Sequence, residues 1–264
     1  MSIILLTNGS QEAHALAHRL QVAGPGLSRV ITTLSEKPNG GVGRRWAMSV
    51  IQWMRMRKLR MDPRIRKALD TEAMLRRKAW NELHSSSWLQ GVRYPLADVE
   101  YTSVDDINST QVVRILERER PELLIVYGTR ILRAPVLRTA QRGVLNAHCS
   151  ILPEYRGVRS EFWQCHDQAY DHVGVTIHLV DEGVDTGMVL FQKRTEVGAD
   201  PDPYSLRTRN TLAIIEHYPL VAKAYLAGEL QPIPQVVGHT RTFRGADITL
   251  ERKVALYGRL AGTV

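Results

Sequence analysis

The start of the chain alternates a short apolar run with an amphipathic stretch, and this order restricts the fold more than any other feature of the sequence. Residues 3–6 are apolar, a polar turn follows at 7–10, and apolar residues then recur at helical spacing from Ala13 to Leu20. Residues 30–34 have the composition of a second strand. A strand, a helix and a strand in this order predict a βαβ unit and a parallel sheet.

The same alternation returns after residue 95. We expect strands at 99–102, 123–127, 143–146, 173–180 and 189–193, and helices at 110–118, 205–227 (with a break at Pro219) and 250–261. The pattern predicts an α/β fold with a Rossmann-like, mostly parallel sheet and flanking helices. We assign residues 1–230 to the main domain, with a helical insert at 40–95, and residues 231–264 to a short C-terminal extension.

Basic residues crowd the insert, interleaved with tryptophan and methionine. The segment predicts two or three basic amphipathic helices and accounts for the formal net charge of +8. Such an excess of positive charge favours an anionic partner. Four interpretations stay open: a nucleic-acid contact, a membrane surface, a lid over a nucleotide-linked small molecule, and a solvated cap or homodimer contact.

Cysteine content and hydropathy exclude several classes of protein. Cys149 and Cys165 are too few for a disulfide framework and have no zinc-binding spacing around them. We therefore expect reduced thiols and no bound metal. The N-terminus lacks the features of a signal peptide, and no run of about 18 apolar residues could cross a membrane. These features predict a cytoplasmic protein, with association at the membrane periphery through residues 40–95 as an open alternative.

Three polar residues form a candidate catalytic group. Asn146 and His148 lie two apart at the end of an expected strand, so their side chains share one face of the sheet. Ligands of open α/β sheets bind at the carboxyl ends of strands. Asp185 lies in a later loop, rich in glycine and acidic residues. If that loop returns over His148, the group can bind an oxyanion and move protons.

Spacing alone does not assign catalytic roles to these three residues, because a single asparagine, histidine or aspartate is more often structural. A resemblance to a known family supplies such roles. The stretch from Gly143 to Lys193 resembles the formyltetrahydrofolate-dependent formyltransferase family. That family's pattern is Asn-x-His-x-Ser-Leu-Leu-Pro-x-x-(Arg/Pro)-Gly, then Gly-x-(Thr/Ser)-x-(His/Met), then Asp-x-Gly. The chain meets it at Asn146, His148, Ser150, Ile151, Leu152, Pro153, Arg156, Gly157, Gly174, Thr176, His178, Asp185 and Gly187.

The resemblance implies a mechanism and a co-substrate. Asn146 and His148 would hold the formyl oxygen while negative charge builds on it, and Asp185 would keep His148 charged and move protons through a water. The co-substrate implied is 10-formyltetrahydrofolate, bound between the loop after residues 123–127 and the loop that carries Asp185. The residues implied in folate binding are Tyr127, Gly128, Ile131, Leu132, Val180, Asp181 and Gly183. For Ile131 and Leu132, a role in the core alone is the alternative.

Two groups of residues are candidate contacts for the acceptor: Asn8, Gly9 and Ser10, and Arg156, Glu161 and Trp163. The first group forms a turn at a helix N-terminus, which attracts phosphate, although an ordinary tight turn also explains it. Glu161 could hold an ammonium group. Trp163 either lines the acceptor pocket or packs within the helix. For His178 we expect a structural or solvated role.

The acceptor expected from these features is the amine of a small molecule, such as an amino sugar on a nucleotide or lipid carrier. Methionyl-tRNA formyltransferase carries a C-terminal β-barrel, and residues 229–264 are too few for five strands, so tRNA is less favoured. The alternatives are methionyl-tRNA or glycinamide ribonucleotide as the acceptor, and a deformylase that passes the formyl group to water. A non-catalytic binding protein would not need Asn146, His148 and Asp185 together.

Overall fold

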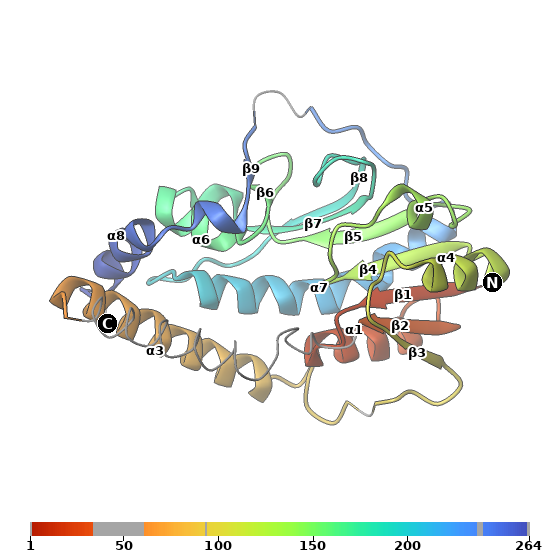
Figure 1. Cartoon of the computed structure of the whole chain (residues 1–264), viewed down its shortest axis with the longest axis horizontal. Coiled ribbons are helices and arrows are strands. Elements are labelled where there is room, and N and C mark those ends of the chain that lie inside the picture. Colours follow the sequence, from red (N-terminus) through yellow and green to blue (C-terminus); the bar gives the residue numbers. More distant parts are fainter. Residues whose placement is uncertain (1, 34–60, 93, 237–239, 263–264) are drawn as a thin grey trace, which may run out of the picture.

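The computed structural model describes residues 2–33, 61–92, 94–236 and 240–262, and its centre is a seven-stranded sheet (Figure 1). The strand order is β3-β2-β1-β4-β5-β7-β8. The strands are β1 (Ile3–Thr7), β2 (Arg29–Thr33), β3 (Glu100–Val104), β4 (Leu123–Tyr127), β5 (Val144–His148), β7 (Gly174–Leu179) and β8 (Val189–Arg194). The first five pair in parallel, while β7 is antiparallel to β5 and β8 to β7. The predicted mostly parallel α/β fold is confirmed.

Helices cover both faces of this sheet. They are α1 (Gln11–Val22), α3 (Pro63–Ser85), α4 (Thr110–Glu119), α5 (Ala134–Leu137), α6 (Ser160–Asp167), α7 (Pro203–Leu226) and α8 (Leu250–Leu260), with short 3₁₀ turns η1 (Tyr170–His172) and η2 (Gly245–Asp247). Alternate residues of β1 enter different cores: Ile3 and Leu5 pack with α1 and α7, and Ile4 and Leu6 pack with α4 and α5. The central strands are therefore apolar on both sides.

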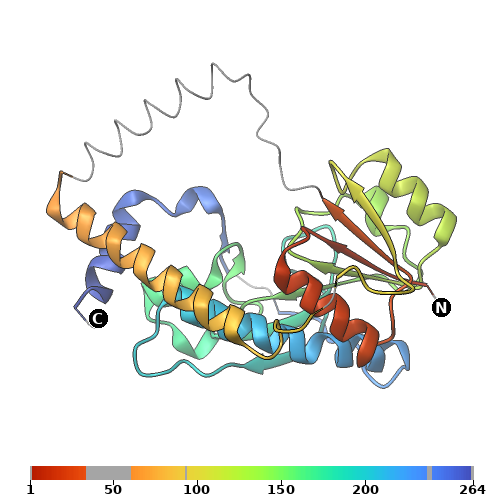
Figure 2. The same ribbon diagram turned by 90° about the horizontal axis from the view of Figure 1, so that it is seen from below.

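A third apolar cluster lies beyond the edge of the sheet, among α3, α6, α7 and α8. It contains Phe162, Trp163 and Leu206, together with Leu256 and Tyr257 of α8. Figures 1 and 2 place this helical part at the end of the molecule opposite the N-terminus. The long helices α3 and α7 run from the sheet into it and join the two parts.

The C-terminal residues join the fold at several places. Thr242–Phe243 form β9, which pairs in parallel with β6 (Arg156–Gly157) as a second small sheet. Ile233 forms an isolated antiparallel bridge with Val189 of β8. Helix α8 packs against α3 and α6. Residues 231–236 and 240–262 thus contact the sheet, the small sheet and the helical end.

One expectation about the helices needs correction. Helix α7 is continuous through Pro219, although an internal proline costs about 3 kcal/mol. Ile215 and Tyr218 before it and Val221 and Ala222 after it are all buried in the same core, and this burial on both sides of the proline stabilises an unbroken helix. Within the described part of the insert there is one long helix, α3; residues 40–60 and 93 lie outside the described residues, so the expected two or three helices stay a prediction. No helix within the described ranges is both long and apolar enough to span a membrane.

Candidate functional site

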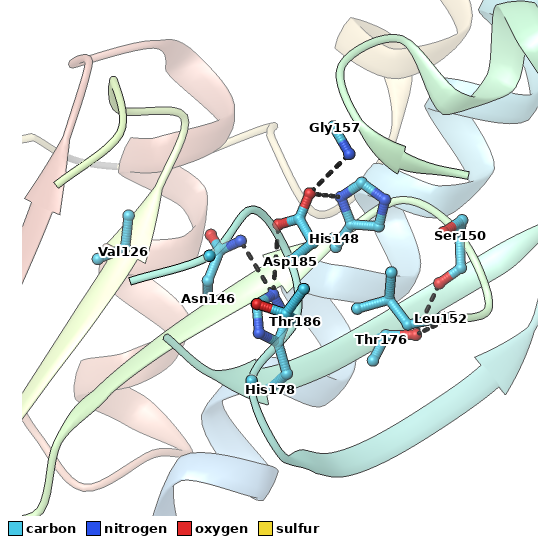
Figure 3. Close-up of polar contacts among 12 residues, drawn as sticks. Val126, Asn146, His148, Ser150, Leu152, Gly157, Thr176, His178, Asp185 and Thr186 are labelled. Carbon is cyan, nitrogen blue, oxygen red and sulfur yellow. Dashed lines mark hydrogen bonds and ion pairs between the residues drawn. The ribbon is translucent and has the colours of Figure 1, made fainter. Parts of the chain in front are cut away.

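Asn146 and His148 lie at the carboxyl end of β5, on one face of the strand (Figure 3). The loop between β7 and β8 returns over them and carries Asp185, which adopts a left-handed backbone conformation with φ of 52°. Aspartate is among the few non-glycine residues that tolerate this conformation. Nδ1 of His148 lies 3.3 Å from Oδ2 of Asp185. The structure therefore brings the three predicted residues together.

The ring of His148 makes contacts through both nitrogens. Nε2 lies 3.0 Å from the carbonyl oxygen of Tyr155 and 3.2 Å from Oγ of Ser160. A carbonyl oxygen can only accept a hydrogen bond, so Nε2 carries a hydrogen. Oγ of Ser160 donates to the same carbonyl at 2.9 Å. His148 thus presents an N–H on the side away from Asp185, toward the start of α6.

Asp185 is held ionised in a largely buried position, with its side chain 13% exposed. Oδ2 accepts a hydrogen bond of 2.8 Å from the backbone N–H of Gly157, and Oδ1 lies 3.5 Å from Nε2 of His178. Burial would raise the pKa of Asp185, but the charge of His148, the contact with His178 and the Gly157 N–H outweigh it and lower the pKa to about 2. The carboxylate can therefore accept protons only transiently.

His178 belongs to this cluster, and the expectation that it could be solvated was wrong, because the residue is 2% exposed. The sheet register places it directly beside Asn146, with Nε2 3.3 Å from the amide nitrogen Nδ2. Nδ1 donates to the carbonyl oxygen of Leu179 at 2.8 Å. Because Nε2 has one site for a hydrogen, the neutral ring accepts from Asn146 and the protonated ring donates toward Asp185.

A threonine of β7 fixes the loop after His148. Oγ1 of Thr176 donates to the carbonyl oxygen of Ser150 at 2.7 Å and accepts from the backbone N–H of Leu152 at 3.1 Å. Oγ of Ser150 donates to the carbonyl oxygen of Glu154 at 2.7 Å. Figure 3 shows the threonine beside this loop. The serine and threonine here thus have a role in loop geometry, and Ser150 is not placed as a nucleophile.

The first predicted folate loop follows β4. Gly128 has a φ of 69°, and a Cβ there would lie 2.9 Å from Nδ2 of Asn8, so only glycine suits this close approach. The side chain of Ile131 is 72% exposed, whereas Leu132 is buried in the core with α4 and α5. The carbonyl oxygen of Ile131 accepts from the amide of Asn108 at 3.0 Å. Ile131 thus presents apolar surface while its carbonyl is engaged, and Leu132 packs in the core.

The second predicted folate loop follows β7 and is braced from within. The backbone N–H of Val180 donates to the carbonyl oxygen of Val144 at 2.7 Å. Oδ1 of Asp181 accepts from the backbone N–H of Gly183 at 3.0 Å and from Oγ1 of Thr186 at 2.7 Å. Val180 packs against the same core as Leu132 of the first loop. Because β7 is antiparallel to β5, this loop starts beside Val144 at the amino end of β5 and runs back to Asp185 near His148, while the loop after β4 starts at the carboxyl end; folate binding between the two loops stays a prediction.

A second polar group lies between β4, β5 and α7. Burial raises the pKa of the Tyr127 phenol and of the Cys149 thiol, and the charge of Glu161 adds to the effect on Cys149. Both groups stay protonated. The carboxylate of Glu161 in turn raises the pKa of Arg207, and Oε2 of Glu161 lies 3.5 Å from Nη1 of Arg207. Glu161, a candidate for acceptor binding, is thus a buried charged residue.

The turn after β1 has its own internal hydrogen bonds. Oγ of Ser10 caps α1 by accepting from the backbone N–H of Ala13 at 3.3 Å, and Oδ1 of Asn8 accepts from the backbone N–H of Ser10 at 3.0 Å. Gly9 has a φ of 69°. These contacts are those of a tight turn and a helix cap. Binding of an anion here stays a prediction.

Arg156 and Trp163 lie in the interior. Arg156 is buried, and its Nη2 donates to the carbonyl oxygen of Thr240 at 2.7 Å. Trp163 is 1% exposed and stacks on Phe243, with 4.6 Å between the ring centroids. Both positions favour a packing role over contact with an acceptor. Within the ranges that the structure covers, no group of three histidine, cysteine or acidic side chains is arranged to hold a metal ion.

Comparison with known proteins agrees with this geometry. Residues 81–221, more than half of the chain, match a family model described as formyl transferase. The methionyl-tRNA formyltransferase of Anaeromyxobacter dehalogenans is 35% identical over 164 residues, which are 61% of this chain and 50% of that protein. That of Myxococcus xanthus is 36% identical over 123 residues, 46% of this chain and 38% of that protein. The chain thus spans half or less of the length of these relatives.

Solved structures share the fold at low sequence identity. Glycinamide ribonucleotide transformylase 1 from Symbiobacterium toebii superposes with a TM-score of 0.55 at 19% identity, over 88% of this chain and 94% of that one. A sugar N-formyltransferase from Shewanella gives a TM-score of 0.56 at 13% identity, over 98% and 88%. The family match over residues 81–221 and this shared fold show that the chain belongs to the formyl transferase family.

Proposed function

We propose that this protein transfers a formyl group from 10-formyltetrahydrofolate to the amine of a small molecule. The observation that carries the proposal is the arrangement of Asn146, His148 and Asp185 at the end of β5. An amide donor and an imidazole share one face, and a carboxylate lies 3.3 Å from the far nitrogen of that imidazole. This is a site that can stabilise an oxyanion and move a proton.

The two donors act on the oxygen of the formyl group. 10-Formyltetrahydrofolate supplies a formyl carbon bonded to nitrogen. As the amine attacks this carbon, Nδ2 of Asn146 and the Nε2–H of His148 donate to its oxygen, which gains negative charge. The Nε2–H now bonds the carbonyl of Tyr155, so binding of the formyl oxygen shares or replaces that bond. One such donor typically contributes roughly 10²–10³-fold to the rate.

Asp185 serves the transfer of protons. The new bond joins the amine nitrogen to the formyl carbon, and the bond from that carbon to the folate nitrogen breaks. The attacking nitrogen loses one proton and the leaving nitrogen gains one. Asp185 is ionised, contacts His148 and is still 13% exposed, so it can move this proton through His148 or a bound water.

The two loops beside β5 suit the folate. The exposed side chain of Ile131 offers apolar surface for a ring, and the loop that starts at Val180, beside Val144, returns to the carboxyl end of β5 with Asp185. The backbone of Leu132 and Asp181 would read the polar edge of the pterin. Tyr127, Gly128 and Gly183 shape the space between the loops.

Methionyl-tRNA is the second candidate acceptor, since the curated relatives are methionyl-tRNA formyltransferases. One observation favours it beyond those names: α3 carries six exposed basic side chains, Arg64, Arg66, Lys67, Arg76, Arg77 and Lys78. A row of cations suits a polyanion. Either acceptor agrees with a cytoplasmic enzyme.

The test is incubation of the purified protein with 10-formyltetrahydrofolate and a panel of amines, with release of tetrahydrofolate as the readout. The panel contains nucleotide-linked amino sugars, glycinamide ribonucleotide and methionyl-tRNA. Release that depends on one amine is the expected result and identifies the acceptor class. Release of the same rate in water alone would instead show a deformylase, and no release with any acceptor would refute the proposed transfer.

A further inference from the structure

A cavity of about 230 Å³ lies among α3, α6, α7 and α8. Arg159, Glu161 and Arg207 line it together with Tyr204 and Tyr257. The proposed catalytic residues Asn146, His148 and Asp185, called the catalytic cluster below, do not line this cavity.

The cavity is joined to the catalytic cluster through α6. Ser160 stands between Arg159 and Glu161 in the sequence, and its Oγ lies 3.2 Å from Nε2 of His148. Consecutive residues at the start of α6 thus line the cavity and contact the imidazole of His148.

One carboxylate oxygen of this cavity is buried without a partner. Glu161 is 2% exposed. Its Oε2 faces Arg207 at 3.5 Å, but its Oε1 has no hydrogen-bond partner among the described residues. Buried charged oxygens are nearly always hydrogen-bonded, since leaving one without a donor is costly. A hydrogen-bond donor on a ligand would satisfy this oxygen if the Glu161 side chain turned toward the cavity, away from the Cys149 thiol beside it.

The cavity also contains one cation without a counter-ion. Lys253 pairs with Glu72 at 2.8 Å, and Arg207 pairs with Glu161. Arg159, in contrast, enters no ion pair within the described part of the chain. The cavity therefore offers one free acceptor, at Glu161, and one free guanidinium, at Arg159.

The volume of the cavity restricts the size of the ligand part that can contact both Glu161 and Arg159. A protein cavity of about 150 Å³ accommodates benzene, so 230 Å³ accommodates about nine non-hydrogen atoms at the same packing. An amine and an acidic group joined by a few bonds fit this space. A larger acceptor, such as a sugar phosphate, fits when the rest of it extends through the open side of the cavity.

We propose that this cavity binds the acceptor end of the substrate, and that this end is a compact amine that also carries an anionic group. Glu161 accepts a hydrogen bond from the amine, and Arg159 donates to the anion. The inference rests on the proposed function, because it assigns the amine that receives the formyl group. It adds a chemical class of acceptor and two specificity-determining residues.

The test is calorimetric titration of the full-length protein with three matched probes: O-phosphoethanolamine, ethanolamine and ethyl phosphate. The first carries both groups, and the others carry one each. We expect O-phosphoethanolamine to bind at least tenfold more tightly than either half. Equal affinities for the three probes, or no binding of O-phosphoethanolamine, would overturn the proposal. A fourth probe, glucosamine 1-phosphate, carries the same two groups on a sugar. If it binds more tightly than O-phosphoethanolamine, the acceptor is assigned to the phosphorylated amino sugars. If it binds more weakly, the acceptor is assigned to the simple amino alcohol phosphates.

Two variants assign the contacts. Arg159→Gln changes an exposed side chain and should weaken O-phosphoethanolamine roughly 10–100-fold while leaving ethanolamine unchanged, because it removes a charge-assisted hydrogen bond. In Glu161→Gln, O-phosphoethanolamine should bind no more tightly than ethyl phosphate. The matched controls are Arg114→Gln and Glu117→Gln, two exposed residues of α4 on the other side of the sheet. Equal weakening by the controls would refute specific binding.

Release of tetrahydrofolate separates this proposal from the proposed function. In Arg159→Gln, the KM for an acceptor of this class should rise by the same factor, while the KM for 10-formyltetrahydrofolate stays that of the parent. Transfer to other amines with no binding of the probes would overturn the assignment of the cavity and leave formyl transfer intact. Specific binding of the probes without any transfer would sink the proposed function alone.

Discussion

Replacement of Asp185 by asparagine tests the mechanism most directly. The side chain keeps its size, and its oxygen can still accept from the backbone N–H of Gly157, now 2.8 Å away. The negative charge 3.3 Å from Nδ1 of His148 is lost. General acid–base groups typically contribute 10²–10⁴-fold, so kcat should fall by roughly that factor. The KM for 10-formyltetrahydrofolate should change little, since the carboxylate acts on protons.

The same substitution has a calculable effect on stability. The pKa of Asp185 is lowered from 3.8 to about 2 in the folded protein, and each unit corresponds to about 1.4 kcal/mol. The charge thus contributes roughly 2 kcal/mol of folding free energy. Because the folded pKa is depressed, this contribution is present above pH 3.8 and is lost as the pH falls toward about 2.

The assays are tetrahydrofolate release and urea unfolding at pH 7 and near pH 2. Asp105→Asn, at an exposed position after β3, is the control for loss of one carboxylate. The free energy of unfolding of Asp185→Asn should be lower than that of the parent at pH 7, and the gap should shrink near pH 2. A folded Asp185→Asn protein with kcat within threefold of the parent would refute the role of this carboxylate.

Three further substitutions probe the groups around the site. His178→Phe removes the acceptor that orients the catalytic amide, and misplacement of this kind should lower kcat by about 10²-fold with an unchanged KM for folate; an unchanged kcat would contradict the positioning role. Gly157→Ala places a Cβ 2.1 Å from a backbone carbonyl oxygen of β9 at a φ of 96°, so it should lower the free energy of unfolding in urea by about 3 kcal/mol. The control is Gly228→Ala, at a φ of 78° with open space around it, which should lower this free energy clearly less. An equal loss in the two variants would argue against the clash. Gln235→Ala removes a donor to the backbone carbonyl oxygen of Asp185 and should speed hydrogen exchange in residues 185–187, which unchanged exchange rates would disprove.

The central strands β1 and β4 were predictable because they are short apolar runs followed by glycine or polar residues. β1 and β4 are buried on both faces, so their composition alone separates them from the amphipathic helices. The proposed catalytic residues Asn146, His148 and Asp185 were predicted from the residue types of a motif. What the motif could not show is the distance between His148 and Asp185, since their approach depends on how a loop folds over the sheet.

The errors have physical causes. The alternation of apolar and polar residues in 173–180 is typical of a strand with one solvated face, but β7 lies between β5 and β8 and is buried throughout except at its last residue. His178 is therefore interior, and it is polar because Asn146 and Asp185 require a partner there. Pro219 indicates a helix end in the sequence, because proline disfavours the interior of a helix. Local propensity contains no information on the core that packs against both halves of α7.

The loop that carries Gly157 and the loop that carries Asp185 meet at the carboxylate of Asp185, and residues much later in the chain hold both loops in place. Phe243 of β9 pairs with Gly157, whose N–H binds the carboxylate, and Gln235 donates to the carbonyl oxygen of Asp185 itself. During synthesis, the sheet and the catalytic trio leave the ribosome well before these residues do. A nascent chain can thus hold a folded sheet before Gln235 and Phe243 have emerged, and the proposed transfer should begin only after these residues have joined the fold.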